Sequence, residues 1–298
     1  MGILAIFAFV VIGSAQDVYL GSFFVIYDPI FVAAITFLIA LFVLQAGFYL
    51  FSRDSLRTII LHKSTLFWFN LVTAMNWISF FIALKYLEPG IVGAVAFSVG
   101  PSMVLIYERY ILLDKKRVKV SNWVSSFGII LSGIFLGTLS VSGGSGIVRG
   151  DFIMILLALG LALLSGIGMT INTYIAKELS NSNLSSKTIT AFRFPLLVFI
   201  ASVWSLINGS IYSSIQLNFV ISTLIVGVVG IVLPMTLIQF GIKYARPKVT
   251  SIVLSLTPAV TFAFEAFDQR IAFSFASMLG IVFCCMFSVL GLLTKEPA

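Results

Sequence analysis

The chain alternates between long apolar runs and short segments that carry most of its charged residues. A helix needs about 20 apolar residues to cross a bilayer, and no segment alternates apolar and polar positions as a transmembrane β-strand does. The pattern therefore predicts an all-α integral membrane protein with ten transmembrane helices. We expect them at about residues 3–24, 29–52, 64–86, 90–112, 121–141, 152–176, 188–207, 219–242, 249–267 and 271–294.

The polar segments between these runs are short. Residues 53–63, RDSLRTIILHK, are expected to form a basic loop, and Leu87-Glu88-Pro89 joins two helices. Residues 142–151, SGGSGIVRGD, lack the Gly-Lys-Ser/Thr of a phosphate-binding loop, so they are expected to be a linker. No Lys or Arg precedes Arg53, so the first apolar run is expected to be a retained helix rather than a cleaved signal peptide.

One motif occurs twice. Lys-Tyr-x-x-Pro begins at residues 85 and 243, and Ser-x-x-Pro-x6-Glu follows each copy, as Ser98, Pro101 and Glu108 and as Ser255, Pro258 and Glu265. Polar matches in register within apolar sequence indicate an internal repeat. We therefore expect two five-helix units, residues 1–148 and 149–298. A repeated unit with an odd number of helices must insert upside down, which predicts the inverted repeat of secondary transporters.

Composition and charge support a membrane protein. The chain has 298 residues, of which 60% are hydrophobic and 10% are charged, whereas soluble domains carry about 25% charged residues. With the N-terminus inside, the inner loops hold thirteen Lys or Arg residues and the outer loops three, which predicts two cytoplasmic termini. This distribution explains the net charge of +7 by topology rather than by nucleic-acid binding. The adjacent Cys284 and Cys285 are expected to pack between helices.

Asp17 is the deepest acidic residue expected within the membrane. Gly13, Asp17 and Gly21 share one helix face, and Asn172 occupies the matching place in the second unit. Intramembrane charge is costly and usually serves a function, so Asp17 and Asn172 are candidates for substrate binding or ion coupling. The alternative is a structural hydrogen bond from Asp17 to a neighbouring helix.

The other candidates are polar residues and prolines inside expected helices. Glu108 and Glu265 are interpreted either as gates at opposite ends of the inverted pair or as ion pairs at helix ends, Glu108 with Arg193. Pro101 and Pro258 each free a backbone carbonyl and could be hinges or line a cavity. Further candidates, each also explicable as a packing contact, are Asn76, Trp77, Ser98, Gln239 and Ser255.

Enzyme and channel functions lack support. The only histidine, His62, lies in an expected loop, and no metal-binding spacing is present. No selectivity-filter motif or ring of charges is present. We therefore expect no catalytic residue, metal or cofactor. The open alternatives are a proton-coupled exporter, a uniporter or exchanger of metabolites, and a membrane enzyme or scaffold.

Ten helices, a five-plus-five repeat and a proline in the fourth and ninth helices resemble the drug/metabolite transporter superfamily, in particular EamA-type exporters. GSAQDVY at residues 13–19 resembles S-adenosylmethionine carriers, whereas residues 74–101 are similar to threonine/homoserine exporters. The chain departs from the family pattern at Ile12, Thr36 and Ile271, where Trp, Arg and an acidic residue are frequent; Asp114 and Arg193 fit it. The resemblance implies a central cavity lined by helices one, three, four, six, eight and nine.

These features predict export of a small amino-bearing metabolite, an amino acid or derivative, across a prokaryotic cytoplasmic membrane. Protons and the lipid bilayer are the expected partners, and the protein is expected to be a monomer or homodimer that binds no nucleic acid. Two functions remain as alternatives: an exchanger or uptake carrier of the S-adenosylmethionine type, and an exporter of cationic drugs.

Overall fold

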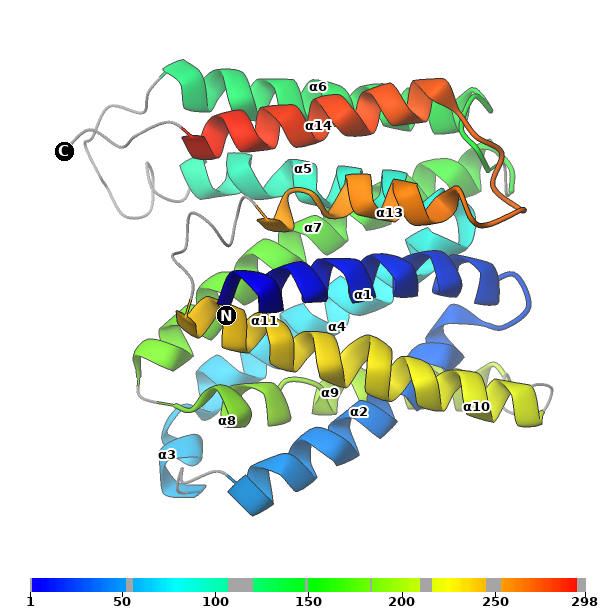
Figure 1. Ribbon diagram of the computed structural model, residues 1–298. Helices are drawn as coiled ribbons and strands as arrows, with labels where there is room; N and C mark the ends of the chain where they lie inside the picture. The colour runs from blue at the N-terminus through cyan, green and yellow to red at the C-terminus, as the bar shows by residue number, and fades with distance from the viewer. Residues whose placement is uncertain are drawn as a thin grey trace.

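The computed structural model describes residues 2–51, 56–106, 120–147, 150–182, 184–209, 216–244 and 253–293, and all regular structure in these residues is helical (Figure 1). The helices are α1 (Gly2–Phe23), α2 (Pro29–Phe51), α3 (Leu56–Leu61), α4 (Lys63–Tyr86), α5 (Pro89–Ile106), α6 (Val120–Val141), α7 (Phe152–Asn181), α8 (Ser186–Ala191), α9 (Pro195–Ile207), α10 (Leu217–Ile225), the π-helical segment η2 (Val226–Val232), α11 (Leu233–Tyr244), α13 (Thr257–Glu265) and α14 (Phe275–Leu293).

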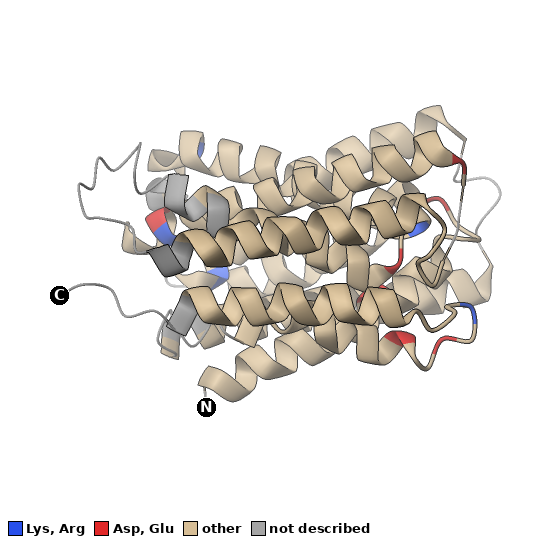
Figure 2. Cartoon of the chain, turned by 90° about the horizontal axis from the view of Figure 1, so that it is seen from above, with Lys and Arg blue, Asp and Glu red and all other residues tan. Residues whose placement is uncertain are grey.

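Seven stretches of the described chain are long and apolar enough to cross a membrane: 2–23, 29–51, 63–86, 123–141, 152–181, 186–207 and 217–241. Two shorter apolar helices cover Pro89–Gly100 and Phe275–Gly291. Figure 2 shows that most of the bundle carries no charged residue, since Asp, Glu, Lys and Arg gather mainly near its two ends. The chain is therefore an integral, multi-pass membrane protein, while the number of ten spans remains a prediction.

The helix ends lie close to the predicted ones, with three local differences. The basic loop contains the short helix α3, and the seventh expected helix is divided into α8 and α9. The expected helix at 249–267 is interrupted, and α13 begins only at Thr257. The last two differences have a local cause at Pro195 and Pro258, because proline removes a backbone donor and begins helices more readily than it continues them.

Pro258 lies in the first turn of α13 rather than in the middle of a continuous helix. Proline lacks the N–H group that would bond to the carbonyl of Leu254, four residues earlier. The hydroxyl of Thr257 takes its place and donates to that oxygen at 2.7 Å. Pro258 therefore lies at a helix start, and the freed carbonyl is satisfied within the same segment. Pro101, in contrast, lies within continuous α5.

A π-helical segment separates α10 from α11. The N–H of Leu233 bonds to the Val228 carbonyl five residues earlier, and Pro234 follows directly. Glycines on this segment permit close contacts: a Cβ at Gly227 would lie 3.0 Å from Ile39, and one at Gly230 would lie 2.8 Å from the side chain of Gln16. The segment is therefore packed tightly against both α1 and α2.

The most extensive helix contacts join helices from the first half of the chain to helices from the second half. α7 packs against α4 and α5, and α1 packs against α11 and α13; α2 contacts α9, α5 contacts α13, and α6 contacts α14. Figure 1 shows the last pair side by side along one edge of the bundle. Buried aromatic rings, including Phe24, Phe37, Phe81 and Phe194, fill the space between α1, α2, α4 and α9. The interior is thus built from side chains of both parts.

The loops at residues 24–28, 87–88, 142–147 and 266–274 meet at one end of the bundle, which we call the distal end. It lies opposite the starts of α1 and α4 and the end of α14 (Figure 1). Backbone hydrogen bonds and close contacts join these loops, for example from Ala272 N to Gly146 O at 2.9 Å. A Cβ at Gly146 would lie 2.3 Å from the Ala272 carbonyl oxygen. The segment that was expected to be only a linker is therefore partly buried structure.

Candidate functional site

Asp17 lies on the face of α1 that points away from its exposed residues Leu4 and Tyr19. The carboxylate is half-buried, and no hydrogen bond or ion pair to it is found within the described part of the chain. On the same face, Gly21 is closely packed, since a Cβ there would lie 3.1 Å from Pro89, whereas a Cβ at Gly13 would meet no atom within 4 Å. The face is therefore closed toward the distal end and open toward the start of α1.

Arg193 lies in the break between α8 and α9, and the sequence explains this break. Pro195 begins α9, and the residues between the two helices leave backbone groups without helical partners. The Asn70 side chain on α4 supplies partners on both sides, because its Nδ2 donates to Phe192 O at 2.7 Å and its Oδ1 accepts from Leu196 N at 3.2 Å. Asn70 thereby holds the break that presents Arg193 to the interior.

The Arg193 guanidinium is half-buried and has no acidic partner among the described residues. Its Nε donates to Thr73 Oγ1 at 3.4 Å, and its Cζ lies 5.1 Å from the Phe69 ring centroid and 5.9 Å from that of Phe194. Met235 Sδ lies 3.7 Å from NH1. Arg193 therefore points between α4 and α11 instead of reaching a helix end, and its positive charge is not neutralised by these contacts.

Polar side chains of α4 and α7 continue this cluster. Thr73 Oγ1 donates to Asn172 Oδ1 at 3.1 Å, and Ser165 Oγ donates to Asn76 Oδ1 at 2.7 Å. Three buried nitrogen donors have no hydrogen-bond partner among the described residues, namely Asn172 Nδ2, Trp77 Nε1 and Gln16 Nε2. Buried polar groups are nearly always satisfied, and an exception calls for an explanation. The interior is therefore rich in hydrogen-bond donors that an acceptor could satisfy.

The remaining candidates lie elsewhere in the structure. Ser98 Oγ donates to Val95 O at 2.6 Å and faces Gly133 of α6. Gln239 is half-buried on α11, and Ser255 is half-buried in the turn before α13. Ser14 joins α1 to α13 by accepting from Thr261 Oγ1 at 3.0 Å. Glu108 and Asp114 lie outside the described residues, and for Pro101 only the backbone is described.

Glu265 was a candidate for an ion pair at a helix end, and the structure gives it other partners. Asp268 pairs instead with Arg270 at 2.7 Å. The Glu265 side chain is 2% exposed, its Oε1 accepts from Gly90 N at 2.6 Å, and it lies beside the equally buried Glu88. Glu88 was not predicted to be a site residue, because a single acidic residue before a proline, in a short connection between two expected helices, is typical of a helix boundary.

The sequence analysis also missed the residues that support Arg193. Asn70 and Thr73 lie at i and i+3 on α4 and share one helix face with Trp77 at i+7, which was already a candidate. That polar spacing in an otherwise apolar helix was an available signal. Ser165, which donates to Asn76, had no comparable signal, because its importance depends on a helix that is remote in sequence.

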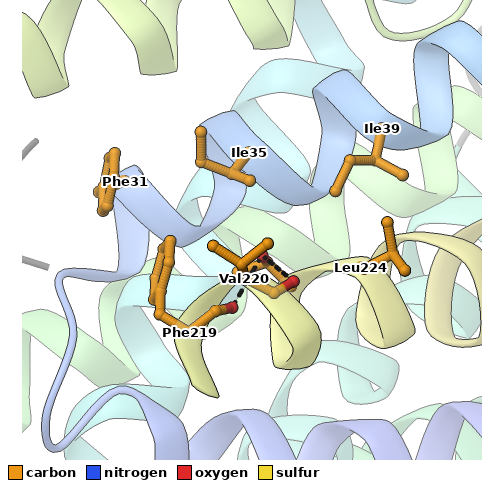
Figure 3. A pocket seen from close by; sticks show the side chains of 7 residues that line it. Phe31, Ile35, Ile39, Phe219, Val220 and Leu224 are labelled. Carbon is orange, nitrogen blue, oxygen red and sulfur yellow. Dashed lines mark hydrogen bonds between the residues drawn. The ribbon is translucent and has the colours of Figure 1, made fainter. Parts of the chain in front are cut away.

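Two grooves open on the outside of the bundle. One, of about 220 Å³, lies between α2 and α10 and is lined by Phe31, Ile35, Ile39, Phe219, Val220, Thr223 and Leu224 (Figure 3). Its one hydroxyl, on Thr223, already bonds to backbone oxygens of its own helix at 2.9 and 3.1 Å. The other, of about 500 Å³, lies between α3–α4 and α8–α9 and includes Lys63 and Asn70. Neither groove is lined by Asp17 or Arg193.

Comparison with known proteins identifies the class of membrane protein. The model of the EamA-like transporter family matches residues 155–293 of the chain. A crystal structure of a protein with 13% sequence identity superposes with a TM-score of 0.62, covering 96% of this chain and 95% of the other. It shows that the two folds are alike. None of the curated proteins matches the chain.

The predicted resemblance to the drug/metabolite transporter superfamily is therefore confirmed. The family consists of membrane transporters, which implies a small-molecule substrate and a lipid environment. Among the residues that the structure describes, no group of three His, Cys, Asp or Glu side chains could hold a metal ion.

Proposed function

We propose that this protein is a secondary-active transporter that exports a small amino acid or a derivative across the cytoplasmic membrane, driven by protons. One observation carries the proposal. The bundle contains the Asp17 carboxylate and the Arg193 guanidinium, and neither group has a charged partner among the described residues. An uncompensated charge in a low-dielectric interior is costly. A zwitterionic substrate would supply an amine to Asp17 and a carboxylate to Arg193.

The architecture in this proposal is ten spans in two inverted units, residues 1–148 and 149–298. Exchanging the units pairs α1 with α7, α2 with α8–α9, α4 with α10–η2–α11, α5 with α13 and α6 with α14. The observed helix contacts support this exchange: α4–α7 corresponds to α1–α11, α5–α7 to α1–α13, and α4–α9 to α2–η2. The contacts α2–α9, α5–α13 and α6–α14 each join a helix to its own counterpart in the other unit, so the exchange leaves them unchanged. The EamA match also falls within the second unit.

The substrate class follows from the chemistry of the interior. Carboxylate groups prefer charge-assisted hydrogen bonds from guanidinium and amide donors, and Arg193 lies next to Thr73, which binds Asn172. A cationic drug without an acidic group would leave Arg193 uncompensated. A phosphorylated sugar would need several basic residues, and Arg193 is the one found in this cluster. The S-adenosylmethionine alternative carries the same amino acid group, so Arg193 does not separate it from a free amino acid.

Transport by the purified protein in lipid vesicles tests this function. Efflux of radiolabelled neutral amino acids is measured with and without a pH gradient, and cationic dyes, S-adenosylmethionine and phosphorylated sugars are added as competitors. We expect gradient-dependent efflux and competition by compounds that carry both an amine and a carboxylate. Competition by phosphorylated sugars but not by amines would contradict the proposal. Exchange that is insensitive to the pH gradient would identify an exchanger instead.

A further inference from the structure

Glu88 and Glu265 bring the two parts of the chain together at the distal end. Glu88 lies between α4 and α5, and Glu265 is the last residue of α13. Both side chains are almost completely buried, with 1% and 2% of their surface exposed. Carboxyl groups are rarely buried without a partner, so their surroundings must explain how they are accommodated.

Each carboxyl group uses one oxygen to accept hydrogen bonds. Glu265 Oε1 accepts from Gly90 N at 2.6 Å, and Glu88 Oε2 accepts from Gly146 N at 2.8 Å and from Ser277 Oγ at 3.1 Å. The other oxygens, Glu88 Oε1 and Glu265 Oε2, accept from no donor in the described part of the chain. The two carboxyl groups are within hydrogen-bonding reach of each other. Two ionised carboxylates would repel at this distance, whereas one proton between them forms a bond and satisfies both.

Among the residues that the structure describes, no cation neutralises the pair. Asp268 adds negative potential next to Glu265, and Arg270 is engaged with Asp268 through both carboxylate oxygens. The helices around the pair carry other described titratable groups, and none of these groups forms a hydrogen bond or ion pair with either glutamate. They are Asp17 on α1, Lys85 and Tyr86 at the end of α4, Asp151 before α7, and Cys284 and Cys285 on α14. In the described part of α5 and α6 there is no charged residue.

The space around the pair also limits its occupant. A Cβ at Gly90 would lie 3.2 Å from Glu265 Oε2 and 3.1 Å from Ile281 Cδ1. Ser277 is fully buried, and neither external groove is lined by these residues. An amine or a hydrated metal ion would need room that the packing does not provide, whereas a proton needs none.

We infer that Glu88 and Glu265 form a proton-binding site in which one shared proton joins the α4–α5 junction to α13 and keeps the distal end closed. Through Gly146 and Ser277 the same site also joins residues 142–147 to α14. Loss of the proton leaves two adjacent negative charges, which favours separation of these elements. The inference concerns the protein alone and does not depend on the proposed substrate.

Infrared spectroscopy of the purified protein in lipid tests for the proton directly, because a protonated carboxyl group has a C=O band that a carboxylate lacks. The measurement is made in a D17N background, so that Asp17 cannot contribute. We expect the band at neutral pH, and its loss in E265Q and in E88Q, where the glutamine amide replaces the carboxyl O–H as donor to the remaining carboxylate. Absence of the band in the D17N protein would overturn the inference without requiring the further variants to fold.

Accessibility of the distal end is the second measurement. Hydrogen exchange at residues 88–95 and 142–147 is followed by mass spectrometry and corrected for the intrinsic effect of pH. We expect protection to fall as pH rises in the parent protein and to stay constant in E265Q. The control is D151N, which changes an exposed carboxylate at the same end of the bundle. Asp151 caps α7 by accepting a hydrogen bond from Met154 N. Equal pH dependence in the parent, E265Q and D151N proteins would contradict closure by the shared proton.

Discussion

The Asn70 side chain donates a hydrogen bond from Nδ2 to the main-chain oxygen of Phe192, 122 positions later in the chain, at 2.7 Å. Together with the bond from Leu196 N to Asn70 Oδ1, this contact replaces helical hydrogen bonds that the break between α8 and α9 removes. The position of Arg193 thus depends on a residue of another helix.

We therefore expect N70A to destabilise the protein, because two backbone groups lose their partner. Each group left unsatisfied costs about 1–3 kcal/mol. The variant should show a lower melting temperature in detergent and weaker transport. N218A removes an exposed amide on α10 and is the matched control. Equal melting temperatures for N70A and wild type would show that Asn70 does not support the break.

D17N should remove transport driven by the pH gradient. The amide has nearly the same shape as the carboxylate but can neither bind an amine as an anion nor exchange a proton. Accumulation in vesicles, measured over a range of pH, should lose its dependence on the gradient, with at most slow exchange remaining. The control D28N changes an acid outside the interior whose Oδ1 accepts from Ile30 N and Phe31 N. If D17N transports like wild type at every pH, Asp17 is a packing residue.

R193Q should weaken binding of substrates that carry a carboxylate. A hydrogen bond to a charged group contributes about 1.5–3 kcal/mol, which corresponds to roughly tenfold to a hundredfold in affinity. The expected result is a higher KM for amino acids and an unchanged affinity for their decarboxylated amines, measured by competition in the vesicle assay. An equal loss for both classes would mean that Arg193 acts on folding rather than on the carboxylate.

Stability should fall as pH rises above the usual pKa of a glutamate. Burial raises the pKa of Glu88 from its usual 4.5, although hydrogen bonds from Gly146 N, Glu265 and Ser277 oppose the shift. The folded state therefore retains a proton that the unfolded state releases, so the free energy of unfolding decreases as pH rises from 4.5 to the folded pKa. Melting temperatures of wild type and E88Q, compared across this range, should converge at low pH. A wild-type profile identical to that of E88Q would contradict this linkage.

Topology provides an independent prediction. Because Lys and Arg favour cytoplasmic loops, reporters fused after residues 148 and 298 should lie outside and inside, respectively. Activity of a reporter enzyme that works on only one side of the membrane distinguishes these positions. A C-terminus on the outside would contradict the expected ten spans and the inverted repeat together.

Much of the fold follows from the sequence, because the membrane imposes a simple rule. Backbone groups in lipid must be satisfied within the segment, so apolar runs such as residues 29–51 predict their own helices. The repeated motif around Pro101 and Pro258 likewise predicted related units from local sequence. Asp17 was identified for the same reason, since an acid within an apolar run is conspicuous without any knowledge of its neighbours.

The tertiary structure decided which polar residues meet. Ser98 and Asn172 are equally polar in sequence, yet one bonds to its own helix and the other to Thr73 on a different helix. The break that exposes Arg193 depends on Asn70, and the burial of Glu88 depends on α13, α14 and a glycine-rich segment. These relationships arise from packing between helices that are more than fifty residues apart in sequence. Periodicity within one segment carries no information about such distant partners.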